Sequence, residues 1–245
     1  MNPSTDLLPY AARLAWWGTA WLRGDLGPDD LLDAVVGTDV AHVVVGSGAE
    51  SVGLVPFLAT ARDRGATAVG AAFPAAGDPV GLRGPRGLTA AAVDAGEAAP
   101  LLGASEALVP RAVGRAVEWA AHPADRRPPP DLGEADRELR AALLDAANGL
   151  AALDVASWSP EVADELHDLR AEEPLPAPPG TPDRCRALAG RALHLRAVLD
   201  LALESEGGAL GLAEIARRRE LLAPLDRAVR RALTAACSPD GWPPR

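Results

Sequence analysis

A loop rich in glycine and proline, residues 77–87, carries charged side chains that could bind a ligand. Two prolines restrict its backbone, and Asp78, Arg83 and Arg86 project charge from it. A guanidinium can hold a carboxylate or a phosphate through paired N–H donors. These three residues therefore form a predicted binding site for a small anionic ligand. The alternative is a structural double turn in which Asp78 bonds its own backbone and the arginines are solvated.

A second candidate site is the glycine-rich stretch that follows the β-branched run at residues 40–45. Gly46 and Gly48 lie where a predicted strand turns into a predicted helix, and such a turn lets backbone amides approach a phosphate. However, the spacing to Gly53 is longer than in dinucleotide-binding motifs, and Glu50 would repel phosphate. A plain glycine-rich turn is the simpler interpretation.

Other reactive patterns are incomplete. Asp164 and His167 have the i, i+3 spacing of metal-binding helices but lack a second matching pair, so a solvated acidic face is expected. Ser105 lies in an imperfect nucleophile-elbow pattern, and a surface serine is the simpler interpretation. The arginines at 217–219 follow a segment similar to the first helix of a helix-turn-helix, without a recognition helix. The sequence predicts no metal, no cofactor and no assignable catalytic residue, and leaves enzymatic activity open.

The charged residues exclude several function classes. All 24 basic residues are arginine, so no lysine can form a Schiff base or grip a nucleotide phosphate. The net charge of -10 disfavours nucleic acid and anionic lipid as partners. Only residues 183–245, with 11 arginines against 8 acids, could offer a basic face. Cys185 and Cys237 form neither a disulfide framework nor a zinc pattern, as expected for buried thiols in a reducing compartment.

Two proline-rich segments divide the chain into the parts that must position these residues. We predict an α/β region over residues 1–122, a linker at 123–133, and a helical region over 134–245 that is interrupted at 173–183. The fold class expected is α+β: a small mixed sheet with flanking helices, followed by an all-helical C-terminal bundle.

Hydrophobic periodicity predicts the elements of the first region. The apolar stripe of the first helix leaves Trp16 off its buried side, which marks Trp16 as a candidate exposed contact, with Trp158 and Trp242 as others. We predict helices at 7–22, 28–36, 54–64 and 111–121, strands at 40–45 and 67–73, and a strand or helix at 88–93 and 98–102.

The helical region shows alternating three- and four-residue spacings of apolar residues. These predict helices at 139–153, 188–202, 212–222 and 225–236, with another beginning near Pro160. Pro224 is expected to separate the last two helices of the chain, because proline disrupts a helix interior. Short connections between such helices favour an antiparallel bundle.

Several short segments carry a family resemblance. These segments are Gly77-Asp78-Pro79, Ala95-Gly96-Glu97-Ala98, Leu153-Asp154-Val155-Ala156 and Pro224-Leu225-Asp226-Arg227. With them, residues 67–237 resemble a conserved actinobacterial protein family of unknown function. The resemblance implies a bacterial cytosolic origin and assigns no catalytic residue.

The leading functional interpretation is a non-catalytic cytoplasmic binding or regulatory protein with a protein partner. It would use the 77–87 loop and the helical face as contact surfaces. One alternative is an enzyme or sensor that binds a small phosphorylated or carboxylated ligand between the two glycine-rich loops, and another is a DNA-binding regulator. The N-terminus has no basic leader, and the apolar stretch at 7–22 is too short and mixed to span a bilayer, so no membrane association is expected.

Overall fold

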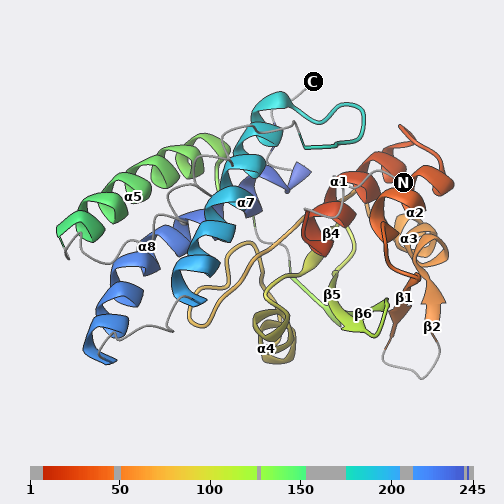
Figure 1. Ribbon diagram of the computed structural model, residues 1–245. Helices are drawn as coiled ribbons and strands as arrows, with labels where there is room; N and C mark the ends of the chain where they lie inside the picture. The colour runs from red at the N-terminus through yellow and green to blue at the C-terminus, as the bar shows by residue number, and fades with distance from the viewer. Residues whose placement is uncertain are drawn as a thin grey trace.

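The computed structural model describes residues 8–46, 51–125, 128–152, 175–204, 212–239 and 242. A curled, mixed six-stranded sheet with its helices forms the N-terminal part, and the C-terminal helices pack together beside it (Figure 1). The predicted α+β class is confirmed. The helices are α1 (Tyr10–Arg23), α2 (Pro28–Val36), α3 (Leu54–Asp63), α4 (Arg86–Ala95), α5 (Leu132–Ala152), α7 (Asp183–Glu204) and α8 (Leu212–Ala236).

The strand order of the sheet separates β1 from β3. The strands are β1 (Ala41–Val45), β2 (Ser51–Gly53), β3 (Ala68–Val69), β4 (Ala99–Leu102), β5 (Glu106–Val113) and β6 (Ala116–Pro123), in the order β2-β1-β6-β5-β4-β3. Only β1 and β6 pair in parallel, and the other neighbours are antiparallel. The predicted strand–helix–strand segment therefore contributes β1 and β3 to opposite parts of the sheet, with three strands between them.

The predicted helix at 111–121 is wrong, because this segment forms most of a β-hairpin. Val113 pairs with Ala116 across a two-residue turn, and Gly114 adopts a left-handed φ of 61° there. Val117 and Trp119 are both fully buried, two residues apart, on one face of β6. This period of two and the glycine turn outweigh the helix propensity of the local alanines.

The predicted strand at 67–73 is buried apart from Thr67, but only Ala68 and Val69 form β3. Gly70 and Ala72 continue the backbone bonds to Pro100 and Ala98, and side chains bond the backbone on the other side of this segment. The Thr19 hydroxyl accepts the N–H of Val69 at 2.9 Å, and the Ser238 hydroxyl donates to the carbonyl of Ala71 at 3.1 Å. This edge of the sheet is thus covered by α1 and by the residues after α8.

Helix α1 is buried on more sides than its apolar stripe predicted. Trp16, the candidate exposed contact, is only 1% exposed, and its indole N–H donates to the carbonyl of Ala236 at 3.4 Å. The expectation of an exposed Trp16 is therefore wrong, because the end of α8 covers the second side of α1. Trp242 is half-buried and donates to the same carbonyl at 3.0 Å, and Trp158 lies outside the described residues.

Helix α7 buries Leu188, Ala192, Leu195 and Leu199 of its predicted stripe. Of the stripe predicted for α5, Leu139 and Ala146 are buried, but Leu143 is 40% exposed. Helices α5 and α8 run antiparallel, since Arg231 pairs with Glu138 near the start of α5 whereas Leu221 packs against Gly149 near its end. The expected break at Pro224 is wrong: α8 continues through this residue. Its two halves bury Leu222, Leu225 and Val229, and this packing holds the helix together across the missing N–H. None of the helices in the described part of the chain is long and apolar enough to cross a membrane.

Candidate functional site

A group of polar and aromatic side chains lies between α1 and the sheet, and we call it the His42 cluster. It consists of Tyr10, Arg13, Asp39, His42 and Trp119. His42 is only 4% exposed, and its imidazole is fully buried. Its Nε2 lies 3.1 Å from a carboxylate oxygen of Asp39, and its Nδ1 accepts the indole N–H of Trp119 at 3.2 Å.

These two contacts fix the protonation state of His42. Because Trp119 can only donate, Nδ1 must carry no proton, so the proton of the neutral ring is on Nε2 and points to Asp39. Burial lowers the pKa of His42 below its ordinary value, against the opposing effect of Asp39. The neutral imidazole thus has both nitrogens occupied, so it has no lone pair free to accept a proton from a substrate.

Arg13 and Tyr10 complete the cluster from α1. Arg13 is 5% exposed, its guanidinium lies 4.0 Å from the carboxylate of Asp39, and it stacks 4.8 Å from the centre of the Tyr10 ring. Tyr10 in turn meets the His42 ring edge-on at 5.6 Å. Burial, together with the charge of Asp39, raises the pKa of the Tyr10 hydroxyl, so this group stays protonated at neutral pH.

A groove of about 1130 Å³ opens beside His42, and we call it the His42 groove. It lies between α2, β1, the start of α3 and the segment that leads into α7. Asp30 and Asp33 stand on its exposed side. Its apolar lining includes Trp17, Leu32, Ala34, Val36, Val40, Ala41, Leu54, Val55, Pro56, Pro176 and Ala177.

A separate cavity of about 610 Å³ lies across β5 and β6, next to the end of α4. Glu97, which lines it, accepts the backbone N–H of Ala11 at 2.7 Å and so caps the first turn of α1. Burial raises the pKa of Glu97. The predicted Ala-Gly-Glu-Ala segment therefore has a structural task, because its carboxylate satisfies a helix end that is distant in the sequence.

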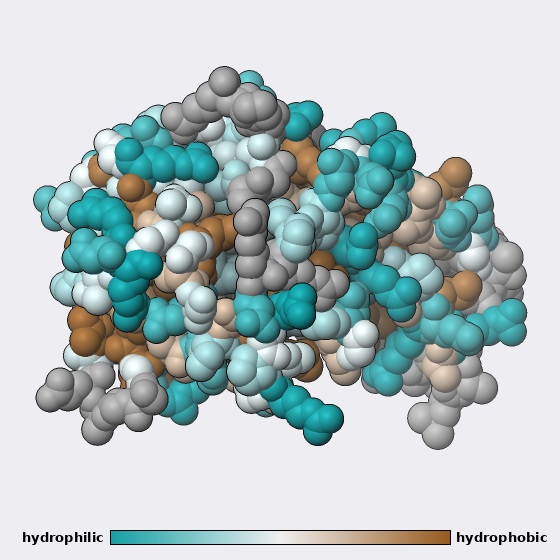
Figure 2. All heavy atoms as spheres, turned by 180° about the vertical axis from the view of Figure 1, so that it is seen from behind, coloured by the Kyte–Doolittle hydropathy of each residue, from teal (hydrophilic) through white to brown (hydrophobic). Residues whose placement is uncertain are grey.

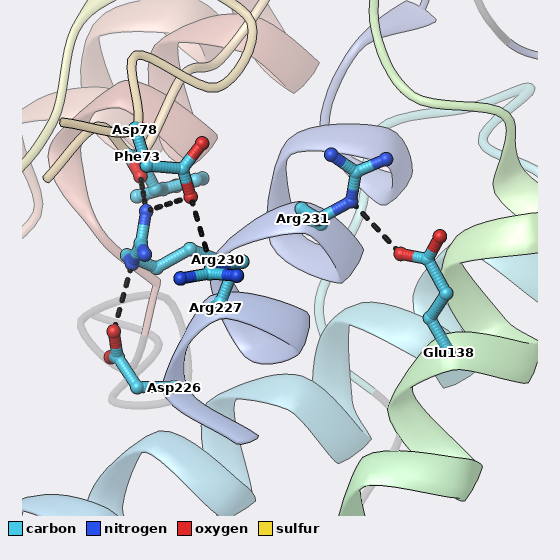
Figure 3. A network of polar contacts seen from close by, with 7 residues as sticks. All are labelled: Phe73, Asp78, Glu138, Asp226, Arg227, Arg230 and Arg231. Atoms are coloured by element: carbon cyan, nitrogen blue, oxygen red, sulfur yellow. Dashed lines mark hydrogen bonds and ion pairs between the residues drawn. The ribbon is translucent and has the colours of Figure 1, made fainter. Parts of the chain in front are cut away.

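The glycine- and proline-rich loop reaches from the sheet to α8. Asp78 forms an ion pair with Arg230 at 3.1 Å, and Arg227 approaches the same oxygen at 4.0 Å. Arg230 also donates to the carbonyl of Phe73 at 3.3 Å and to Asp226 at 3.0 Å (Figure 3). The carboxylate of Asp78 is therefore engaged within the chain, between the loop and α8.

The structure places the two predicted glycine-rich segments apart, with the arginines of the 77–87 loop at the start of α4. Arg83 is 71% exposed and lies 3.9 Å from Asp125, and Arg86 is exposed at the first position of α4. Gly46 directly follows β1, whose last residue, Val45, lines the cavity beside the second half of α4, roughly 8–13 Å along the helix from Arg86. Gly48 lies outside the described residues.

The glycine-rich stretch at Gly46 also differs from the predicted strand-to-helix turn. It connects β1 to β2, which pair antiparallel, and α3 begins only after β2. Backbone amides at Gly46 therefore do not lie at the start of α3. The geometry that phosphate-binding turns use is absent at this residue.

Ser105 and the two cysteines occupy ordinary structural positions. Ser105 is exposed in the turn between β4 and β5, so it is the predicted surface serine. The Asp164 and His167 pair falls outside the described residues. Within the described ranges, no group of three or more His, Cys, Asp or Glu could hold a metal ion. Both cysteines are buried and free, and burial raises the pKa of Cys185 to about 11, which keeps its thiol protonated.

Comparison with protein families decides the membership of the chain. Residues 11–132 match the model described as Rv1486c-like protein, N-terminal domain, and residues 133–234 match its C-terminal domain. The chain belongs to the Rv1486c-like protein family. The function of this family is unknown, as the predicted resemblance implied. No curated protein and no solved structure matched this member.

The two family domains meet at the His42 groove. Asp33, Val40 and His42 belong to the N-terminal domain, whereas Pro176 and Arg186 belong to the C-terminal domain. The motifs of the sequence did not predict this site. The available signal was His42 itself, a polar residue at an alternate position of a β-branched run, where a buried histidine needs partners.

Proposed function

We propose that this protein is a non-catalytic cytoplasmic binding protein whose partner occupies the His42 groove. One observation carries the proposal: residues of both family domains line a single large groove, so an occupant would contact both at once. Binding sites often lie at such junctions between domains.

The His42 cluster supports binding in preference to catalysis. The buried imidazole of His42 is held by Asp39 and Trp119, and the guanidinium of Arg13 lies against Asp39 and Tyr10. A buried cluster fixed in this way holds β1 and α1 beside the groove in place, and a preorganised site lowers the entropic cost of binding. They do not supply a free general base or nucleophile.

A thermal-shift screen of small molecules and short peptides tests the proposal. Val40 is 66% exposed and lines the groove, so Val40→Arg should remove the stabilisation by any ligand that binds there. Val113→Arg is the matched control, because Val113 is also exposed, at 44%, but does not line the groove. Hits that survive Val40→Arg, or that both variants weaken equally, would contradict the proposal.

A second candidate function is binding of a small phosphorylated or carboxylated ligand by Arg83 and Arg86. The observation that favours it is the exposure of both side chains beside the start of α4, which has no side-chain cap. Sugar phosphates, nucleotides and acyl carboxylates should then stabilise the protein, and Arg83→Ala should abolish this. Arg111→Ala, at a 74% exposed arginine on β5, is the control that should leave the shift unchanged.

The DNA-binding alternative receives no support from α8. This helix is continuous from Leu212 to Ala236, so no turn precedes a separate recognition helix. If retention on DNA at low salt survived replacement of Arg217, Arg218 and Arg219 by alanine, α8 would not be the binding surface.

A further inference from the structure

The charges beside the His42 groove are unbalanced. Asp30 and Asp33 lie one turn apart on α2, and both are exposed. Arg186 is the arginine among the lining residues, and its guanidinium already lies 3.3 Å from Asp183 and 3.0 Å from the carbonyl of Leu175. His42 is held neutral. The groove therefore presents two carboxylates and no uncommitted positive charge among its described lining residues.

The size and lining of the groove favour a chain segment over a small molecule. Its volume of about 1130 Å³ exceeds the roughly 300–1,000 Å³ of ordinary small-molecule pockets. Aliphatic side chains and prolines make up most of the lining, and Val40 and Pro56 expose apolar surface along it. Figure 2 shows further apolar side chains at the lower left, at the end of the molecule where β1 and β2 lie. Val52 of β2, the strand next to β1, is also 44% exposed, so apolar surface at this end extends beyond the groove.

We propose that the His42 groove binds a peptide segment of a partner protein that carries apolar side chains and at least one basic side chain. This inference rests on the proposed function and specifies the chemistry of the partner. The apolar side chains would cover Val40, Val55 and Pro56, and the basic side chain would pair with Asp30 or Asp33. The negative N-terminal part of the chain, with 26 acids against 13 arginines over residues 1–182, would favour the approach of such a segment.

Three labelled peptides that repeat the unit Leu-Ala-Xaa test this chemistry by fluorescence anisotropy. Xaa is arginine in the first peptide, the uncharged isostere citrulline in the second and glutamate in the third. With exposed carboxylates each contributing a few-fold, the arginine peptide should bind on the order of ten-fold more tightly than the citrulline peptide. The glutamate peptide should bind most weakly, and added salt should reduce these differences.

Substitutions in α2 test whether the carboxylate of Asp33 pairs with the basic side chain of the peptide. Asp33→Asn should weaken binding of the arginine peptide about three-fold and leave the citrulline peptide unchanged. Asp29→Asn is the matched control, because Asp29 is exposed on the same helix but does not line the groove. Asp30 is less suitable for substitution, since its carboxylate accepts the N–H of Gly27 at 3.2 Å and caps α2.

The outcomes separate this inference from the proposed function. Equal binding of the arginine and citrulline peptides, lost in Val40→Arg, would overturn the basic partner and leave the groove as a binding site. Peptide binding that Val40→Arg does not affect would count against both. If no peptide binds but small molecules do, or if Val40→Arg alone changes the sedimentation of the protein, the occupant is a small molecule or a second copy, and the peptide proposal fails.

Discussion

His42 shows how one buried side chain depends on residues that are distant in the sequence. Its partners come from a turn, Asp39, and from the β-hairpin that contains Trp119, and it packs against Tyr10 of α1. A single buried histidine can be recognised in a sequence, but its partners cannot, because their proximity depends on the parallel pairing of β1 with β6. Likewise, the charges of Asp78, Arg83 and Arg86 were evident, whereas the pairing of Asp78 with Arg230 required the tertiary fold.

The lowered pKa of His42 predicts a specific pH dependence of stability. In the folded protein this pKa lies below the ordinary 6.5, so between the two values the unfolded chain binds a proton that the folded chain does not. The contribution of neutral His42 to the free energy of unfolding is therefore fully present above pH 6.5 and is lost as the pH falls below that value. Urea unfolding from neutral to mildly acidic pH should show a slope of up to about 1.4 kcal/mol per pH unit that His42→Asn lacks.

A second histidine gives the control for this measurement. His194→Asn on α7 should keep the slope, because its ring is not part of the His42 cluster. Glu97 gives a pH dependence of stability with the opposite sign, because burial raises its pKa above the ordinary 4.5. Its contribution to the free energy of unfolding is lost as the pH rises above that value. The difference between wild type and variant, and not the raw curve, isolates His42. An identical slope in wild type and His42→Asn would contradict the fixed neutral imidazole.

At the scale of elements, helices with regular apolar stripes were predictable and the sheet was only partly so. The predicted bounds of the helix at 28–36 agree with α2, and the stripe at 188–202 is buried in α7. The hairpin at 106–123 was not predictable from local propensity, because its alanines and arginines also suit a helix. Its register depends on burying Trp119 against α1, and only the assembled sheet supplies that contact.

The turn before β5 requires glycine. Gly103 has a φ of 93°, and a Cβ at this position would lie 2.1 Å from the carbonyl oxygen of Gly65. Gly103→Ala should therefore lower the free energy of unfolding by about 2–4 kcal/mol, from backbone strain and displacement of the 65–66 segment. Gly87→Ala is the control: its Cβ would meet nothing within 4 Å inside α4, so it should be neutral or stabilise by up to about 1 kcal/mol.

Helix α8 tolerates Pro224 at a cost that can be measured. The residue is exposed in the helix interior, where a proline leaves the carbonyl four residues earlier without its donor. Pro224→Ala should raise the free energy of unfolding by about 1–3 kcal/mol in denaturant titrations. The neighbouring exposed variant Ala223→Gly should lower it by about 1 kcal/mol. A loss of stability in Pro224→Ala would show that the packing of α8 requires the proline.

At the scale of the whole molecule, the loop between β3 and α4 joins the two family domains. Asp78 contacts Arg230, and Gly81 packs so closely on Thr234 that a Cβ would lie 2.6 Å from its methyl group. These glycines and prolines therefore shape a docking segment, which explains why a loop rich in turn residues is also partly buried. The division of the chain into separate regions remains a prediction, and the strength of this contact bears on whether they unfold together.

The ion pair between Asp78 and Arg230 gives the test of that coupling. The Arg230 side chain is 13% exposed and also donates to Phe73 and Asp226, so Arg230→Met should leave several acceptors unpaired and cost about 2 kcal/mol. Arg231→Met is the matched control, because the neighbouring pair with Glu138 lies within the helical region and is more exposed, and its loss should cost less than about 1 kcal/mol. Tryptophan fluorescence reports mainly the N-terminal domain, whereas far-ultraviolet circular dichroism reports the helices of both domains, of which the longest, α5, α7 and α8, belong to the C-terminal domain. If the loop contact couples the two domains, the two probes should report a single unfolding transition in wild type and in Arg231→Met. In Arg230→Met they should report separate transitions. Coincident transitions in all three proteins would place the coupling elsewhere, for example at the contact between Trp16 and Ala236.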